Sequence, residues 1–171
     1  MNKKTRLILV FLFIVIGVVL HVKTGIGSAW YLYAAAFILM ITHFLFGNVL
    51  TAFGHLNKGQ LKQAESIIDA VKRPDFLLKG HRAYYYFVKG MIALQHKEYP
   101  EAEKNLKMAL DIGLRTSTDK ALTGLNLAHM CFLQQRYPEC RDYVARVKTE
   151  GSTDLMIKDK LKELEMALAG K

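Results

Sequence analysis

The chain has 171 residues and a formal net charge of +9, which suits one compact domain with an appendage. Four of its 24 basic residues and none of its 15 acidic ones fall in residues 1–50, so the remaining positive excess is mild and dispersed. That distribution argues against a nucleic-acid-binding protein, and the 2 cysteines, without a CxxC motif or a Cys/His cluster, argue against a metal site.

Two apolar stretches come first in the chain. Residues 5–22 would form about 27 Å of helix and residues 29–50 about 33 Å, against a bilayer core of about 30 Å. Trp30, Tyr31 and Tyr33 stand at the start of the second stretch, where aromatic rings meet lipid headgroups. The sequence therefore predicts a two-helix transmembrane hairpin over residues 1–50, with lipid contact through residues 7–50.

The basic residues predict an orientation for this hairpin. They lie in the N-terminal tail and after the second stretch, whereas the connection holds only Lys23. The positive-inside rule then places both termini in the cytoplasm, and we expect an integral protein of the bacterial inner (cytoplasmic) membrane. A cleaved signal peptide ending at Gly27-Ser28-Ala29 is the rival, so whether the first span is retained stays open. His43 within the second stretch is expected to be neutral, and its role stays open.

Helices are predicted throughout residues 51–171. The second apolar stretch has no stop signal before Asn57-Lys58-Gly59, which predicts one continuous helix into this region. Further helices are expected at about 60–72, 80–95, 100–112, 117–134 and 138–150, with Thr116 among the candidate caps. The last helix, from Thr153-Asp154, carries an apolar stripe of Ile157, Leu161, Leu164 and Leu168.

A period of 38 residues runs through these helices. Tyr99-Pro100 is echoed at Tyr137-Pro138, and small residues at 64, 102 and 140 are followed by branched aliphatic residues at 68, 106 and 144. Another set keeps the same step at Ala52, Gly90 and Ala128. Since one helical hairpin cannot bury its apolar face alone, this period predicts a stack of hairpins.

Residues 45–150 resemble tetratricopeptide repeats (TPR). The matching positions are Ala52, Ala64, Ile68 and Val71; then Gly90, Ala102, Leu106 and Ala109; then Ala128, Cys140, Val144 and Val147. The step is 38 residues rather than the 34 of that family, and the terminal prolines are missing. The resemblance implies an all-α chain, with a TPR-like α-solenoid of about three hairpins and a C-terminal capping helix over residues 51–171.

Catalytic motifs are not found in the sequence. It lacks a glycine-rich phosphate loop, an HExxH pair, a Gly-x-Ser-x-Gly elbow and a dinucleotide fingerprint. We therefore predict no enzyme, no catalytic residue, no cofactor and no metal. An enzyme of unrecognised type, using His129 or the tyrosines at 84–86, is the weakest hypothesis.

In the TPR family the first helix of each hairpin lines a concave groove. By that register the predicted protein-binding groove consists of Tyr84, Val88, Met91, Gln95, Asn126, His129 and Leu133. Versions that clamp a carboxylate use lysines, an arginine and asparagines there, and Asn126 is the one match. The mostly apolar set favours an apolar or amphipathic segment, although the last helix or a second copy filling the groove is an open alternative.

The predicted function combines these parts. We expect a membrane-anchored adaptor or scaffold that binds a protein partner, of unknown identity, through the TPR-like groove at the cytoplasmic face. The alternative is a structural subunit of a membrane assembly or a homo-oligomer. Neither hypothesis includes nucleic acid.

Overall fold

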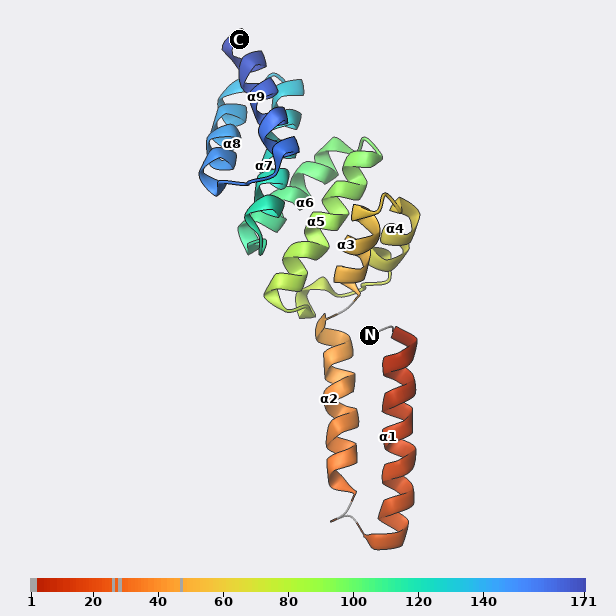
Figure 1. Ribbon diagram of the computed structural model, residues 1–171. Coiled ribbons are helices and arrows are strands. Elements are labelled where there is room, and N and C mark those ends of the chain that lie inside the picture. The colour runs from red at the N-terminus through yellow and green to blue at the C-terminus, as the bar shows by residue number, and fades with distance from the viewer. Residues whose placement is uncertain (1–2, 26, 28, 47) are drawn as a thin grey trace.

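The computed structural model describes residues 3–25, 27, 29–46 and 48–171 (Figure 1). Every regular element in these ranges is helical, so the all-α prediction is confirmed. The elements are α1 (Lys3–Thr24), α2 (Trp30–Phe46), α3 (Val49–Asn57), α4 (Leu61–Asp69), the 3₁₀ turn η2 (Pro74–Phe76), α5 (Lys79–Gln95), α6 (Tyr99–Ile112), α7 (Ser117–Leu133), α8 (Tyr137–Glu150) and α9 (Leu155–Ala169).

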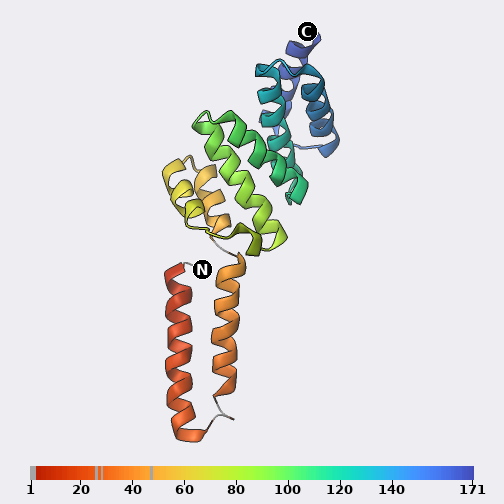
Figure 2. The ribbon, with the colours of Figure 1, turned by 180° about the vertical axis from the view of Figure 1, so that it is seen from behind.

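The first two helices form an antiparallel hairpin that extends away from the other helices (Figures 1 and 2). Small residues set its close contacts, because a Cβ added at Gly17 would lie 3.1 Å from the Tyr33 ring. Ala29 and Ala36 are buried in the same hairpin. The outward sides of both helices carry exposed large apolar side chains, including Phe11 and Phe37.

The predicted transmembrane hairpin is wrong, and so is the predicted location in the bacterial inner membrane with both termini in the cytoplasm. Within the part of the chain that the structure describes, no helix combines the length and the apolar character needed to cross a membrane. Helix α2 has 17 residues, which is shorter than the roughly 20 residues of a span. The apolar run in α1 covers only residues 7–20 between basic ends. The side chain of His43 and the Ser28 cleavage site lie outside the described residues.

The prediction that the second apolar stretch continues as one helix to residue 57 is also wrong. Helix α2 ends at Phe46 and α3 begins at Val49. Asn48 between them has φ −102° and ψ 21°, well away from helical values of about −63° and −42°. Helix α3, the first helix of the α3–α4 hairpin, therefore has only 9 residues, whereas α5 and α7 each have 17 residues.

Three helical hairpins follow one another, α3–α4, α5–α6 and α7–α8. Their first helices end at residues 57, 95 and 133 and their second helices begin at 61, 99 and 137, so the 38-residue step is kept. Gly59, Lys97 and Gln135 occupy the same turn position with φ of 71°, 62° and 60°. In each turn the next residue donates its N–H to the carbonyl five residues earlier, at 2.8 to 2.9 Å. This is the Schellman ending of a helix, repeated three times.

The small residues with the 38-residue step lie inside the hairpins, as predicted. All six are buried: Ala52, Ala64, Gly90, Ala102, Ala128 and Cys140. A Cβ added at Gly90 would lie 2.8 Å from Cγ of Leu106 and 3.1 Å from its backbone N. The absence of a side chain at Gly90 therefore lets α5 and α6 approach closely.

The C-terminal helix α9 packs against α7 and α8 (Figure 1). Its start is capped by the Asp154 carboxylate, which accepts from the N–H groups of Met156 and Ile157. Ile157, Leu164 and Leu168 are buried, so the predicted apolar stripe covers the end of the stack.

Candidate protein-binding surface

The seven residues predicted to line a groove lie in two different environments. Tyr84 and Val88 are buried in the core, 4% and 0% exposed. The ring of Phe53 on α3 lies 5.0 Å from that of Tyr84, and the Tyr84 hydroxyl donates to the Asp119 carboxylate. Tyr84 therefore joins neighbouring hairpins, and neither Tyr84 nor Val88 faces solvent.

The other five residues are half-buried or exposed, and we call them the α5–α7 surface: Met91 and Gln95 on α5, and Asn126, His129 and Leu133 on α7. Nδ2 of Asn126 lies 3.7 Å from Sδ of Met91, which joins the two helices. Gln95, His129 and Leu133 are exposed, and Leu133 is 56% exposed although it is a large aliphatic residue. The surface thus combines apolar side chains with polar ones.

Helix α7 presents its part of this surface because of its register. Asn126, His129 and Leu133 follow at steps of three and four, which places them on one side of a helix. Thr116 fixes the start of α7 by accepting from the N–H of Asp119 at 3.0 Å, as predicted for this cap. The amide of Asn126 also donates to the carbonyl of Leu122 at 2.9 Å, which holds its orientation.

Burial raises the pKa of a tyrosine and of both cysteines in the core. Burial and the hydrogen bond to Asp119 raise the pKa of Tyr84 to about 12, so this hydroxyl stays protonated at neutral pH. Burial raises the pKa of the thiols of Cys131 and Cys140, which keeps them in the unreactive thiol form. In the described ranges no group of His, Cys, Asp and Glu is arranged to hold a metal ion.

An ion pair between α6 and the turn before α8 could not be found from the sequence. Arg136 donates to both carboxylate oxygens of Glu103, at 2.7 and 3.0 Å, and Lys107 lies 2.6 Å from the same carboxylate. Arg136 also binds Glu139 at 2.8 Å. The hydrogen bond from Arg136 lowers the pKa of Glu103 from 4.5 to about 2. The only signal in the sequence is opposite charge 33 residues apart, which is too weak to predict a contact.

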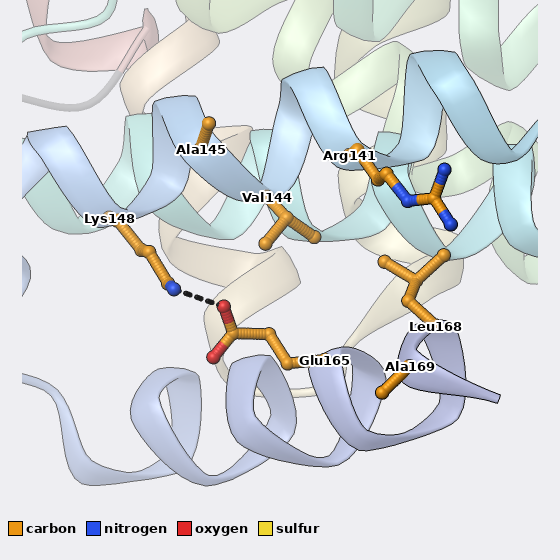
Figure 3. A pocket seen from close by; sticks show the side chains of 7 residues that line it. All are labelled: Arg141, Val144, Ala145, Lys148, Glu165, Leu168 and Ala169. Carbon is orange, nitrogen blue, oxygen red and sulfur yellow. Dashed lines mark ion pairs between the residues drawn. The ribbon is translucent and has the colours of Figure 1, made fainter. Parts of the chain in front are cut away.

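A cleft of about 420 Å³ lies between α8 and α9 (Figure 3). It is lined by Arg141, Val144, Ala145, Lys148, Glu165, Leu168 and Ala169. Lys148 and Glu165 form an ion pair across one end, while Arg141 lies at the end near Leu168 (Figure 3). Val144 and Leu168 lie between these charged residues (Figure 3). It shares no residue with the α5–α7 surface, and it was not predicted because it depends on where α9 docks.

Comparisons of the chain with protein-family models, with curated proteins and with solved structures find no match. Function is therefore inferred from the residues and their contacts.

Proposed function

We propose that the chain is a non-enzymatic adaptor or scaffold whose TPR-like hairpins bind an apolar or amphipathic segment of a partner protein. The observation that carries this proposal is the 56% exposure of Leu133, which lies two helical turns after Asn126, the residue whose amide contacts Met91. Methionine is enriched in protein interfaces, and polar groups form their rims, as Gln95, Asn126 and His129 do around Met91 and Leu133 in this proposal.

The architecture supports the same function. Three hairpins share one turn geometry and one set of buried small residues, at Ala52, Gly90 and Ala128 in the first helices. Arrays of stacked helical hairpins present extended surfaces on which other proteins bind. We therefore propose that residues 51–171 form a TPR-like solenoid, which accounts for both the repeated turn geometry and the TPR-like residues.

The composition of the surface specifies the partner segment. Met91 has a flexible, polarisable side chain that adapts to different apolar shapes, and Leu133 offers a fixed aliphatic one. Gln95, Asn126 and His129 provide hydrogen-bonding groups around them. This pairing fits an amphipathic helix that places its apolar side on Met91 and Leu133.

A second copy of the chain is the alternative occupant of this surface. Helix α9 packs on α7 and α8 through Ile157, Leu164 and Leu168, and it leaves Gln95, His129 and Leu133 exposed. The surface is therefore available to a segment from another molecule. Self-association through it would make the chain a structural subunit of a homo-oligomer.

The test uses the full-length chain and a library of displayed peptides. Selected peptides are measured against the unmodified chain, Leu133→Asp, and the matched control Met166→Asp, whose residue is 63% exposed on α9. We expect Leu133→Asp to weaken binding by at least about 10-fold, as for a central apolar contact, and the control to leave it unchanged. Equal binding by both variants would contradict the proposal.

The same samples distinguish the alternative. A molecular mass that rises with protein concentration, and falls in Leu133→Asp alone, would identify a second copy as the occupant. A mass independent of concentration, together with loss of peptide binding in Leu133→Asp, would support the adaptor.

A further inference from the structure

Most of the exposed large apolar side chains in the described ranges lie on the outward sides of the α1–α2 hairpin. On α1, Phe11 is 69% exposed and Val22 82%, and on α2, Phe37 and Ile38 are 59% and 60% exposed. Monomeric soluble proteins rarely expose contiguous apolar patches of more than a few hundred Å². The hairpin therefore needs a further molecule to cover it.

The distribution of these side chains around α1 limits what that molecule is. Exposed apolar positions run around the helix from Ile14 to Ile16, an arc of about 200° at ~100° per residue. Gly17 lies on the remaining side, against Tyr33 and Leu32 of α2. A folded protein partner docks on one face of a helix, whereas this surface is apolar over more than half of the circumference. An apolar medium that surrounds the hairpin fits it better.

The charges and aromatic rings of the hairpin point to the same medium. No acidic residue occurs before Glu65. At the loop end His21 and Lys23 are exposed, and Trp30 and Tyr31 are 62% and 50% exposed. Aromatic rings of this kind concentrate at the level of lipid headgroups, and basic residues are attracted to anionic headgroups. A second copy would instead bring like charges together without an acid to pair them.

We propose that lipid covers the α1–α2 hairpin: acyl chains contact the apolar sides of both helices, and anionic headgroups contact the loop end around Lys23 and Trp30. The contact runs along the sides of the helices and does not depend on a helix that crosses the bilayer. It is independent of partner binding at the α5–α7 surface, which lies on other helices.

Trp30 provides a direct measurement because the chain has 1 tryptophan. The full-length chain is purified in detergent and transferred to vesicles of phosphatidylcholine, with or without phosphatidylglycerol. We expect the chain to float with the vesicles, with a larger bound fraction when phosphatidylglycerol is present. Trp30 emission should move to shorter wavelength, and lipids brominated near the headgroup should quench it more than lipids brominated near the chain end.

A pair of substitutions tests the apolar sides. Phe11→Asp with Phe37→Asp should lower the vesicle-bound fraction by at least about 10-fold, because two charges would enter an apolar phase. Leu155→Asp, at a residue 74% exposed on α9, is the matched control and should bind as the unmodified chain does. Circular dichroism of all variants checks that the helices are retained.

Two results would overturn the proposal. One is equal flotation of the hairpin variant and the control. The other is a shift of Trp30 emission that appears with rising protein concentration in the absence of lipid and does not change when vesicles are added, which would identify a second copy as the cover. If the variant with Phe11→Asp and Phe37→Asp loses its helices, the unmodified chain still tests the proposal. Trp30 quenching that is no stronger with lipids brominated near the headgroup than near the chain end would then contradict it.

Discussion

The ion pair between Glu103 and Arg136 leads to a prediction about how the second and third hairpins are held together. Arg136 contacts both oxygens of the carboxylate, which is the strong two-bond geometry, and Glu103 is 13% exposed at its side chain. Glu103 lies on α6 and Arg136 in the turn between α7 and α8, so the pair connects two hairpins directly.

We predict that Glu103→Gln destabilises the folded chain. The fall of the Glu103 pKa from 4.5 to about 2 corresponds to about 3 kcal/mol between its two protonation states. Arg136 is 31% exposed and keeps Glu139 as a partner, so solvent screening reduces this value. We expect a loss of about 1–2 kcal/mol in the free energy of unfolding at neutral pH.

The sign of the pH dependence follows from the lowered pKa. The carboxylate is stabilised by folding, so its contribution is fully present above about pH 4.5 and is lost as the pH falls toward about 2. Replacing it with glutamine removes that part of the acid sensitivity. The unmodified chain should therefore lose more stability on acidification than Glu103→Gln does.

Urea unfolding of the full-length chain, followed by circular dichroism at several pH values between about 7 and 3, measures this difference. Glu163→Gln, at an exposed position on α9, is the control and should behave as the unmodified chain. The interpretation is refuted if Glu103→Gln and the unmodified chain lose stability equally on acidification.

Three further predictions concern single substitutions at a helix contact, a turn and a helix cap, and their effect on stability can be measured by urea or thermal unfolding. Gly90→Ala should destabilise by about 1–3 kcal/mol because its Cβ meets Leu106, whereas Gly54→Ala, with no atom within 4 Å of its Cβ, should be neutral or stabilising. A neutral Gly90→Ala would show that α5 and α6 separate easily. Gln135→Gly should stabilise by up to about 1 kcal/mol, since its φ of 60° costs less for glycine; a large loss would contradict this. Asp154→Ala should cost about 1 kcal/mol through the lost cap of α9, and no change would show that the cap is not used in solution.

The hairpins were predictable from sequence because their signals are local and repeated. Pro100 and Pro138 mark the starts of second helices, and the buried small residues recur at a fixed step. Each of these features depends on helix geometry within about 40 residues, which sequence patterns report well. Gly113 and Gly151, both with positive φ, follow helix ends as expected.

The errors and omissions came from contacts between elements. Helical register says which side of α5 carries Tyr84 and Val88, but not that α3 with Phe53 covers that side. The break near Asn48 was missed because apolar residues continue on both sides of it. The Arg136–Glu103 pair and the cleft beside α9 depend on how distant helices dock, and no local pattern encodes that.

The shared turn at Gly59, Lys97 and Gln135 determines where the length of this chain is free to change. Inserting one residue in such a turn would disrupt the hydrogen bonds that close it and would displace the second helix, moving its small residues away from their partners. The links between hairpins already differ in length, spanning residues 70–78 and 113–116. Insertions, deletions or a grafted extra hairpin should therefore be accepted in those links and rejected in the turns.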